Sequence, residues 1–207
     1  RGWLARGGSH GLLPRTAPAD DRRSGPRRAL ATVQKLSSPK GRISSYQIIA
    51  KAQAKAGRQT EGQATMALVD NILATEVKPA HFQDFELSNL VEAYFDVGAG
   101  ERAISLVASL PQPSGKYQVR AGVRKVVYEL AKAGKTEEAL EFSQQQFGYE
   151  DANGRFFEMC RGYAAGKRFD EALRTAGRLP ESHRGSVYSR VCDEIILAED
   201  LRRAREV

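Results

Sequence analysis

Cysteine and histidine are scarce in this chain. Of its 207 residues, two are Cys and three are His. Cys160 and Cys192 belong to no CxxC pair, and the histidines are spread along the chain without the spacing of metal ligands. The sequence therefore indicates neither a disulfide framework nor a zinc site. We expect no bound metal and no cofactor.

Long apolar runs are absent as well. No window approaches the roughly 18 consecutive apolar residues of a membrane-spanning helix, so the sequence predicts no membrane span. Hydrophobic residues still make up 41% of the chain. A chain of this length and composition can bury a core without disulfides or a structural metal. We expect a soluble or peripheral protein.

Acidic residues are nearly missing from the first 42 positions. Residues 1–42 hold ten Lys and Arg against two Asp, a net charge of +8, whereas the remaining 22 basic and 23 acidic residues give −1. This segment is also rich in Gly, Pro, Ser and Arg and lacks apolar periodicity, which predicts an extended arm. Arg-rich, Ser-containing, acid-poor N-termini are typical of organelle transit peptides, so we expect a plastid or mitochondrial protein. We expect the arm to lie on a larger assembly, tethered by its paired arginines Arg22, Arg23, Arg27 and Arg28.

One ten-residue sequence motif occurs three times in the remainder of the chain. "AGKTEEALEF" at 133–142 reappears as "AGKRFDEALR" at 165–174 and, less plainly, as "VGAGERAISL" at 97–106. We define the anchor positions as the turn residues five before the Ala of each motif. The anchors are separated by 41, 36, 33 and 32 residues and are Gly57, Gly98, Gly134, Lys167 and Glu199. A period near 34 residues is the mark of an α-solenoid.

Apolar residues recur at fixed distances before each anchor, at about positions −11, −8, −7 and −4, the spacing of one helix face. The columns at −8 and −7 are wholly apolar: Ile49, Leu90, Val126, Met159 and Val191, then Ala50, Val91, Val127, Cys160 and Cys192. We therefore expect both cysteines to be core residues. Small residues stand five after each anchor and allow a second helix to approach: Gly62, Ala103, Ala139, Ala172 and Ala204. The pattern predicts paired helices at about 43–56 and 59–74, 83–97 and 100–109, 117–132 and 136–147, 153–165 and 168–178, and 184–198 with a partner from 200.

These repeats resemble the tetratricopeptide and pentatricopeptide superfamily over residues 43–207. "YQIIAKAQAKAGRQTEGQATMALVDNILATEVKPA" carries the aromatic start, "KAG" turn and "VKP" exit of a pentatricopeptide unit, while "GKRFDEAL" and "GKTEEAL" suit either family. Tetratricopeptide units usually place a small residue seven before the turn, where this chain has Val91 and Val127, so a pentatricopeptide-like or hybrid repeat is favoured. We expect an all-α fold, a right-handed α-solenoid of about five helix-turn-helix repeats over 43–207, preceded by the extended basic arm over 1–42.

Two motifs that suggest nucleotide chemistry have a simpler interpretation. "GAGERA" at 98–103 fits a dinucleotide-binding loop, but that loop follows a strand and "NLVEAYFDV" has the helical face of the other repeats. We therefore expect a turn between helices. "PSGKY" at 113–117 lacks the first glycine and the Ser or Thr of a phosphate loop, so we expect a linker. No set of Ser, His and Asp or of Cys and His emerges, and we expect no enzyme and no small-molecule substrate.

The resemblance implies a binding surface on the first helices. In pentatricopeptide proteins that bind single-stranded RNA, the residue ten before the anchor reads a base, usually through Asn, Ser or Thr. Here this inner column is Gln47, Ser88, Arg124, Phe157 and Ser189. Only two of the five suit the code, and Arg and aromatic residues also anchor protein interfaces. We expect a non-catalytic scaffold that binds protein subunits of a large organellar complex, a photosynthetic supercomplex or a ribosome. The alternative is a pentatricopeptide-like RNA-binding protein whose basic arm contacts phosphates.

Overall fold

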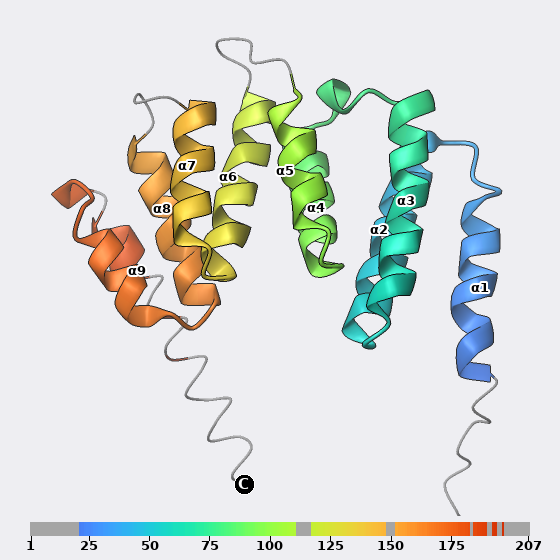
Figure 1. Ribbon diagram of the computed structural model, residues 1–207, viewed down its shortest axis with the longest axis horizontal. Helices are drawn as coiled ribbons and strands as arrows, with labels where there is room; N and C mark the ends of the chain where they lie inside the picture. The colour runs from blue at the N-terminus through green and yellow to red at the C-terminus, as the bar shows by residue number, and fades with distance from the viewer. Residues whose placement is uncertain are drawn as a thin grey trace, which may run out of the picture.

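The structure is a computed structural model that describes residues 21–110, 117–147, 152–182, 184–189, 192, 193 and 196, with side chains from residue 25 and outside 117–119, 147, 152 and 153. Every regular element in these ranges is helical, which confirms the all-α class (Figure 1). The helices are α1 (Asp21–Val33), α2 (Pro39–Lys55), α3 (Gln59–Thr75), the short 3-10 helix η1 (Pro79–His81), α4 (Asp84–Asp96), α5 (Gly100–Ala108), α6 (Tyr117–Lys132), α7 (Thr136–Phe147), α8 (Ala152–Ala165) and α9 (Phe169–Ala176). None of the helices in this part of the chain is long and apolar enough to cross a membrane.

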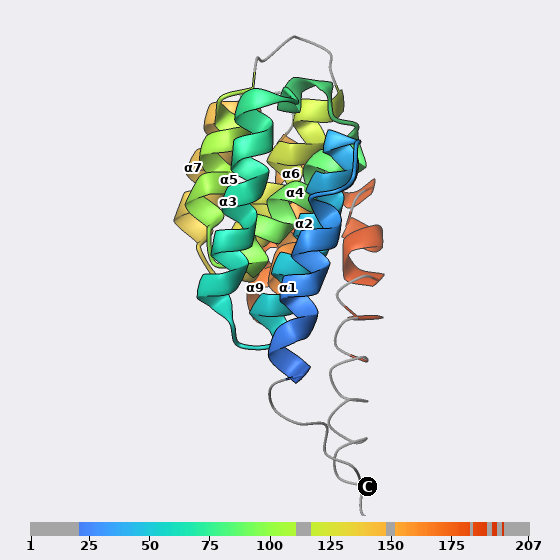
Figure 2. The ribbon, with the colours of Figure 1, turned by 90° about the vertical axis from the view of Figure 1, so that its right-hand side faces the viewer.

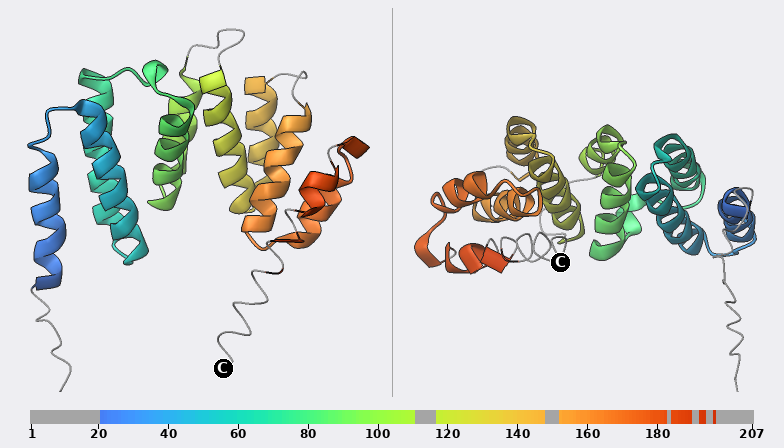
Figure 3. Two further views of the ribbon diagram at one scale, coloured as in Figure 1. Left: turned by 180° about the vertical axis from the view of Figure 1, so that it is seen from behind. Right: turned by 90° about the horizontal axis from the view of Figure 1, so that it is seen from below.

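The helices from α2 to α9 pack in consecutive pairs. α2 contacts α3, α4 contacts α5, α6 contacts α7 and α8 contacts α9, while the first helices of neighbouring pairs also contact one another. The pairs stand along one line (Figure 3), and seen from the end α3, α5 and α7 lie on one side and α2, α4 and α6 on the other (Figure 2). We call α2, α4, α6 and α8 the first-helix layer. For α2 to α9 the predicted helix boundaries agree with the structure to within two residues, except that α2 begins at Pro39 and not at 43. The predicted helix 184–198 is described only in part, and residues 181 and 182 are already helical.

The turns between paired helices require a left-handed backbone at the anchor positions. The φ angles there are +74°, +72°, +80° and +61° at Gly57, Gly98, Gly134 and Lys167. Glycine adopts this conformation without steric cost, so three anchors have the residue that such a helix end favours. Lys167 is the only non-glycine residue with a positive φ in the described ranges. The "GAGERA" segment therefore is a turn between two helices, as predicted.

The core lies between the helices of each pair and between neighbouring pairs. In the two wholly apolar columns every member with a described side chain is buried, except Ile49, which is partly buried, and Cys192, which is exposed. The prediction that Cys192 packs in the core is therefore wrong. In its segment Val187 is buried, whereas Tyr188, which stands eleven before the anchor Glu199 and so belongs to the −11 column, is exposed. The buried face of this segment therefore differs from the predicted one. Val191, Glu199, Ala204 and "PSGKY" up to residue 116 lie outside the described residues.

The predicted extended arm differs from the structure over residues 21–42. Residues 21–33 form α1, which packs against α2. Pro26, Leu30 and Val33 are four and three residues apart and form a short apolar stripe, in which Val33 is buried. The many charged residues around this stripe make it hard to recognise in the sequence. Ser38 caps α2, its Oγ accepting a hydrogen bond from the Gly41 amide at 3.2 Å. With Pro39 at the first helical position, this cap begins α2 four residues before the predicted boundary. Residues 1–20 lie outside the described part.

Candidate functional site: a cationic pocket on the first-helix layer

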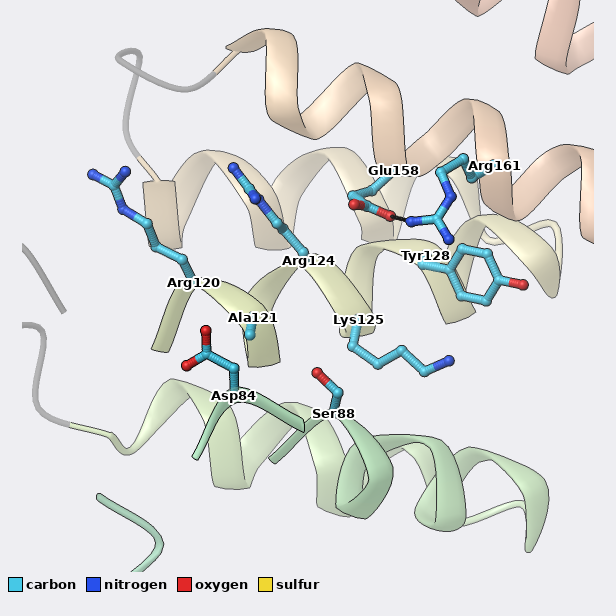
Figure 4. A pocket seen from close by; sticks show the side chains of 9 residues that line it. All are labelled: Asp84, Ser88, Arg120, Ala121, Arg124, Lys125, Tyr128, Glu158 and Arg161. Carbon is cyan, nitrogen blue, oxygen red and sulfur yellow. Dashed lines mark hydrogen bonds and ion pairs between the residues drawn. The ribbon is translucent and has the colours of Figure 1, made fainter. Parts of the chain in front are cut away.

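A pocket of about 350 Å3 opens on the first-helix layer between α4, α6 and α8. None of the second helices of the pairs (α3, α5, α7 and α9) contributes a lining residue, so the pocket faces away from the α3, α5 and α7 side of the molecule. We call it the cationic pocket, and Figure 4 shows its lining side chains: Asp84, Ser88, Arg120, Ala121, Arg124, Lys125, Tyr128, Glu158 and Arg161. Four of these residues are basic and two are acidic.

Helical spacing explains why these side chains converge. Arg120, Arg124 and Tyr128 are four residues apart along α6 and form one stripe on its surface. Asp84 and Ser88 have the same spacing on α4, and Glu158 and Arg161 are three apart on α8. Because the three helices pack side by side, these short stripes border the same opening (Figure 4).

The contact between α6 and α8 depends on a glycine. A Cβ atom placed on Gly162 would lie 2.3 Å from the carbonyl oxygen of Tyr128 and 2.8 Å from Cβ of Ala131. Only glycine permits this approach of one helix backbone to the other. The approach brings Arg161, the neighbour of Gly162 in the chain, to the ring of Tyr128 on α6.

Two aromatic rings and a guanidinium group meet at the α8 side of the pocket. The guanidinium carbon of Arg161 lies 5.6 Å from the ring centre of Tyr128 and 5.9 Å from that of Phe157. Its Nη1 atom donates a hydrogen bond of 2.9 Å to Oε2 of Glu158. Burial raises the pKa of the Glu158 carboxyl, and the positive charges of Arg161 and Arg124 offset only part of this effect.

Lys125 occupies the other side of Tyr128 and joins the pocket to a row of charges. Its Nζ atom lies 4.6 Å from the ring centre of Tyr128, 2.9 Å from Oε2 of Glu92 and 3.0 Å from Oε1 of Glu129. Glu92 also pairs with Lys51 on α2, so one carboxylate links three first helices. We call Lys51, Glu92, Lys125 and Glu129 the charge ladder.

The charge ladder shifts the pKa values of its members. Burial alone would raise the pKa of Glu92, but hydrogen bonds from Lys125 and Lys51 outweigh it and lower that pKa to about 2. Burial would likewise lower the pKa of Lys125, yet its bonds to Glu92 and Glu129 hold the pKa above its usual range. Glu92, Lys51 and Lys125 therefore stay ionised at neutral pH, and Lys125 is engaged with carboxylates of the protein itself.

Arg120 is the cation of the pocket that is most open to a ligand. Its side chain is exposed. Among the residues that the structure describes, it forms no ion pair. In Figure 4 it reaches out from α6 beside Arg124, with Asp84 on the facing helix. At this edge of the pocket a negatively charged ligand can approach Arg120. Arg161 and Lys125 are less available to it because carboxylates of the protein already pair with them.

The structure brings together three residues of the predicted inner column and separates the other two. Ser88 and Arg124 line the cationic pocket, and the half-buried Phe157 lies at its edge beneath Arg161. Gln47 is only 8% exposed and lines a different cavity between α2 and α4. Ser189 is exposed in helical residues 184–189 and lines neither cavity.

Sequence reasoning missed four of the residues that give the pocket its character. These are Arg120, Lys125, Tyr128 and Arg161. Two of them were within reach of the repeat register, because Tyr128 and Arg161 both stand six before their anchors and so occupy equivalent positions on α6 and α8. The inner column is therefore one of several columns that face this side.

The predicted arm tether is described only in part. Arg27 and Arg28 are exposed on α1, and Arg27 borders a third cavity of about 750 Å3 between α1, α2 and α3. The side chains of Arg22 and Arg23 lie outside the described ones. Their role stays a prediction.

The described residues place few other groups in position for chemistry. Cys160 is buried, and burial raises the pKa of its thiol to about 12, which keeps it protonated and unreactive. No group of three or more His, Cys, Asp or Glu residues in the described ranges is placed to hold a metal ion. Comparisons of the chain with protein-family models, with curated proteins and with solved structures give no match.

Proposed function

We propose that this chain is a non-catalytic scaffold: a right-handed α-solenoid of about five helix-turn-helix repeats, of tetratricopeptide or pentatricopeptide type, that binds protein partners on its first-helix layer. The observation that carries the proposal is the cationic pocket, where Tyr128 and three Arg side chains gather on α6 and α8, with Phe157 beside Arg161 at its edge. Aromatic and Arg side chains are the residues that most often anchor protein interfaces. A large organellar complex remains the predicted setting, on the composition of the N-terminus alone.

Charge favours a protein over RNA as the partner. Lys125 is paired with two carboxylates and Arg161 with a third, so these two basic residues of the pocket are already engaged. The net charge of −1 over residues 43–207 also lacks the excess of cations from which RNA affinity largely comes.

Single-stranded RNA binding is the second candidate, and one observation favours it. Tyr128 and Phe157 are rings flanked by Lys125 and Arg161, an arrangement on which bases can stack. The exposed Arg27 and Arg28 of α1 would add phosphate contacts.

The test is capture of partners from isolated organelles by the tagged full-length chain, with and without ribonuclease. The variant Arg124→Ala, Phe157→Ala should lose its protein partners, because truncating such anchors commonly costs about 2 kcal/mol or more. Leu173→Ala, Arg174→Ala is the matched control, since it removes an exposed apolar side chain and an exposed cation from α9, outside the pocket. Loss of every partner after ribonuclease would place RNA binding first instead.

A further inference from the structure

A second cavity, whose wall is partly apolar, lies next to the cationic pocket, between α2 and α4. Its volume is about 120 Å3. Ile43 and Phe82 are buried in its wall, and Phe85, 61% exposed, stands at its border. We call it the apolar pocket, and it is lined by Lys40, Ile43, Ser44, Gln47, Phe82, Phe85, Glu86 and Asn89. The apolar part of its wall, formed by Ile43, Phe82 and Phe85, can contact one apolar side chain, and the ion pair between Lys40 and Glu86 borders it.

Apolar side chains continue from this pocket onto the open surface. Ile48 is 67% exposed and follows Ser44 by four residues on α2, on the stripe that borders the pocket. Phe85 contributes an exposed aromatic ring from α4. Large apolar side chains that gather beside a cavity mark an interaction surface more often than single scattered ones do.

The two pockets flank the same helix. Asp84 and Ser88 border the cationic pocket, and their chain neighbours Phe85 and Asn89 border the apolar pocket. Packed helices lie about 8–10 Å apart, so the two pockets are separated by about 10 Å. An extended chain advances about 3.3 Å per residue, and three or four residues therefore span this distance.

The charge of the cationic pocket indicates which second group the ligand carries beside its apolar side chain. Lys125 and Arg161 are paired with carboxylates of the protein, whereas Arg120 is exposed and forms no ion pair with a described residue. A carboxylate that enters beside Arg120 would offset the positive charge of this side chain. A basic side chain would add to this charge, so charge complementarity favours an acidic ligand.

We propose that the two pockets together bind an acidic segment of a partner protein, with a large apolar side chain in the apolar pocket and an Asp or Glu three or four residues away beside Arg120 and Arg124. This inference rests on the proposed scaffold function and names the partner's chemistry. The segment can lie inside the partner chain or at one of its ends, because the two recognised groups are side chains and not a chain terminus. Phe85 and Arg120 are the two exposed residues that decide its affinity.

The test uses the full-length chain and a capped ten-residue peptide of mainly Ser and Gly. The peptide contains one Phe, and its two Glu are centred four residues after that Phe. Fluorescence anisotropy should detect binding that weakens at least fivefold when the peptide Phe becomes Ala or its Glu become Gln. Phe85→Ala should weaken binding of the parent peptide but not of the Ala peptide. Arg120→Gln should weaken binding of the parent peptide but not of the Gln peptide. Both altered side chains are exposed, so the fold should survive.

Several results would overturn this inference. Equal affinity for the Glu and Gln peptides, no binding of the parent peptide at millimolar concentration, or tighter binding of a uridine decamer would each reject the acidic segment as ligand. Leu173→Ala, Arg178→Gln, with both positions exposed and outside the pockets, serves as control and should bind like the wild type. If Phe85→Ala, Arg120→Gln keeps the organelle partners that Arg124→Ala, Phe157→Ala loses, the scaffold function stands and the ligand class proposed here is wrong.

Discussion

Replacing Gly162 by Ala should destabilise the protein although it adds one methyl group to a helix. The new Cβ would lie 2.3 Å from the Tyr128 carbonyl oxygen, 2.8 Å from Cβ of Ala131 and 3.0 Å from the Lys132 amide nitrogen. Backbone atoms cannot rotate away, so α8 must move from α6. Overpacking of this kind costs about 1–3 kcal/mol or more, and Ala recovers about 1 kcal/mol of helix propensity. With a contact this short, we expect a net loss of about 2 kcal/mol in the free energy of unfolding.

Urea denaturation followed by circular dichroism measures this loss. Gly41→Ala is the matched control, because Gly41 is also helical, in α2, and its added Cβ would be no closer than 3.4 Å to Ser38. There the gain in helix propensity should appear alone, as about 0.5–1 kcal/mol of added stability. If Gly162→Ala proves as stable as the wild type while Gly41→Ala shows its gain, α6 and α8 do not approach as described.

Three further changes test the core, a turn and the charge ladder. Met159→Ala removes a buried side chain that is 2% exposed, and should lower the free energy of unfolding in urea by about 2–5 kcal/mol; an unchanged transition would refute the repeat register. Lys167→Gly should stabilise the turn by about 0.5–1 kcal/mol because φ is +61° there, whereas Lys167→Ala, which keeps the Cβ, should give no such gain in the same assay. The pKa of Glu92 is lowered to about 2, so its contribution is present above its ordinary pKa of about 4.3 and is lost as pH falls toward 2. This fall corresponds to about 3 kcal/mol, and because 33% of the side chain is exposed, screening reduces it to about 1–2 kcal/mol. Glu92→Gln should therefore be less stable than the wild type at pH 7 and approach it near pH 2, in denaturation measured at both pH values; an equal deficit at both would contradict the ionic origin.

The helices and their turns were predictable because their signals are local and repeated. An apolar stripe of helical period needs only neighbouring residues to be recognised, and a turn with positive φ leaves its mark as glycine. Register even identified Lys167 as a turn position without a glycine, from the spacing of the residues around it. Helix α1 escaped prediction because its stripe has few members and includes Pro26, and because Arg residues dominate its composition.

The candidate site was predictable only in part. The inner column includes Ser88 and Arg124, which the structure places in the lining of one pocket, while their predicted binding role stays a prediction. Gln47 occupies the same column and is nearly buried, since α2 and α4 close around it and leave only the small apolar pocket. Equivalent sequence positions thus have unequal exposure, and exposure depends on the distance between helices.

The amino-acid sequence by itself determined the helical class, the pairing of helices and most of the buried columns, because each of these depends on periodicity along one chain segment. The tertiary structure alone decided which charges meet. Lys51, Glu92 and Lys125 are about 35 to 75 residues apart in the chain, and they form one ladder because α2, α4 and α6 pack side by side. Likewise, Gly162 is one of several helical glycines, and only the packing of α8 on α6 shows that a methyl group cannot be added there.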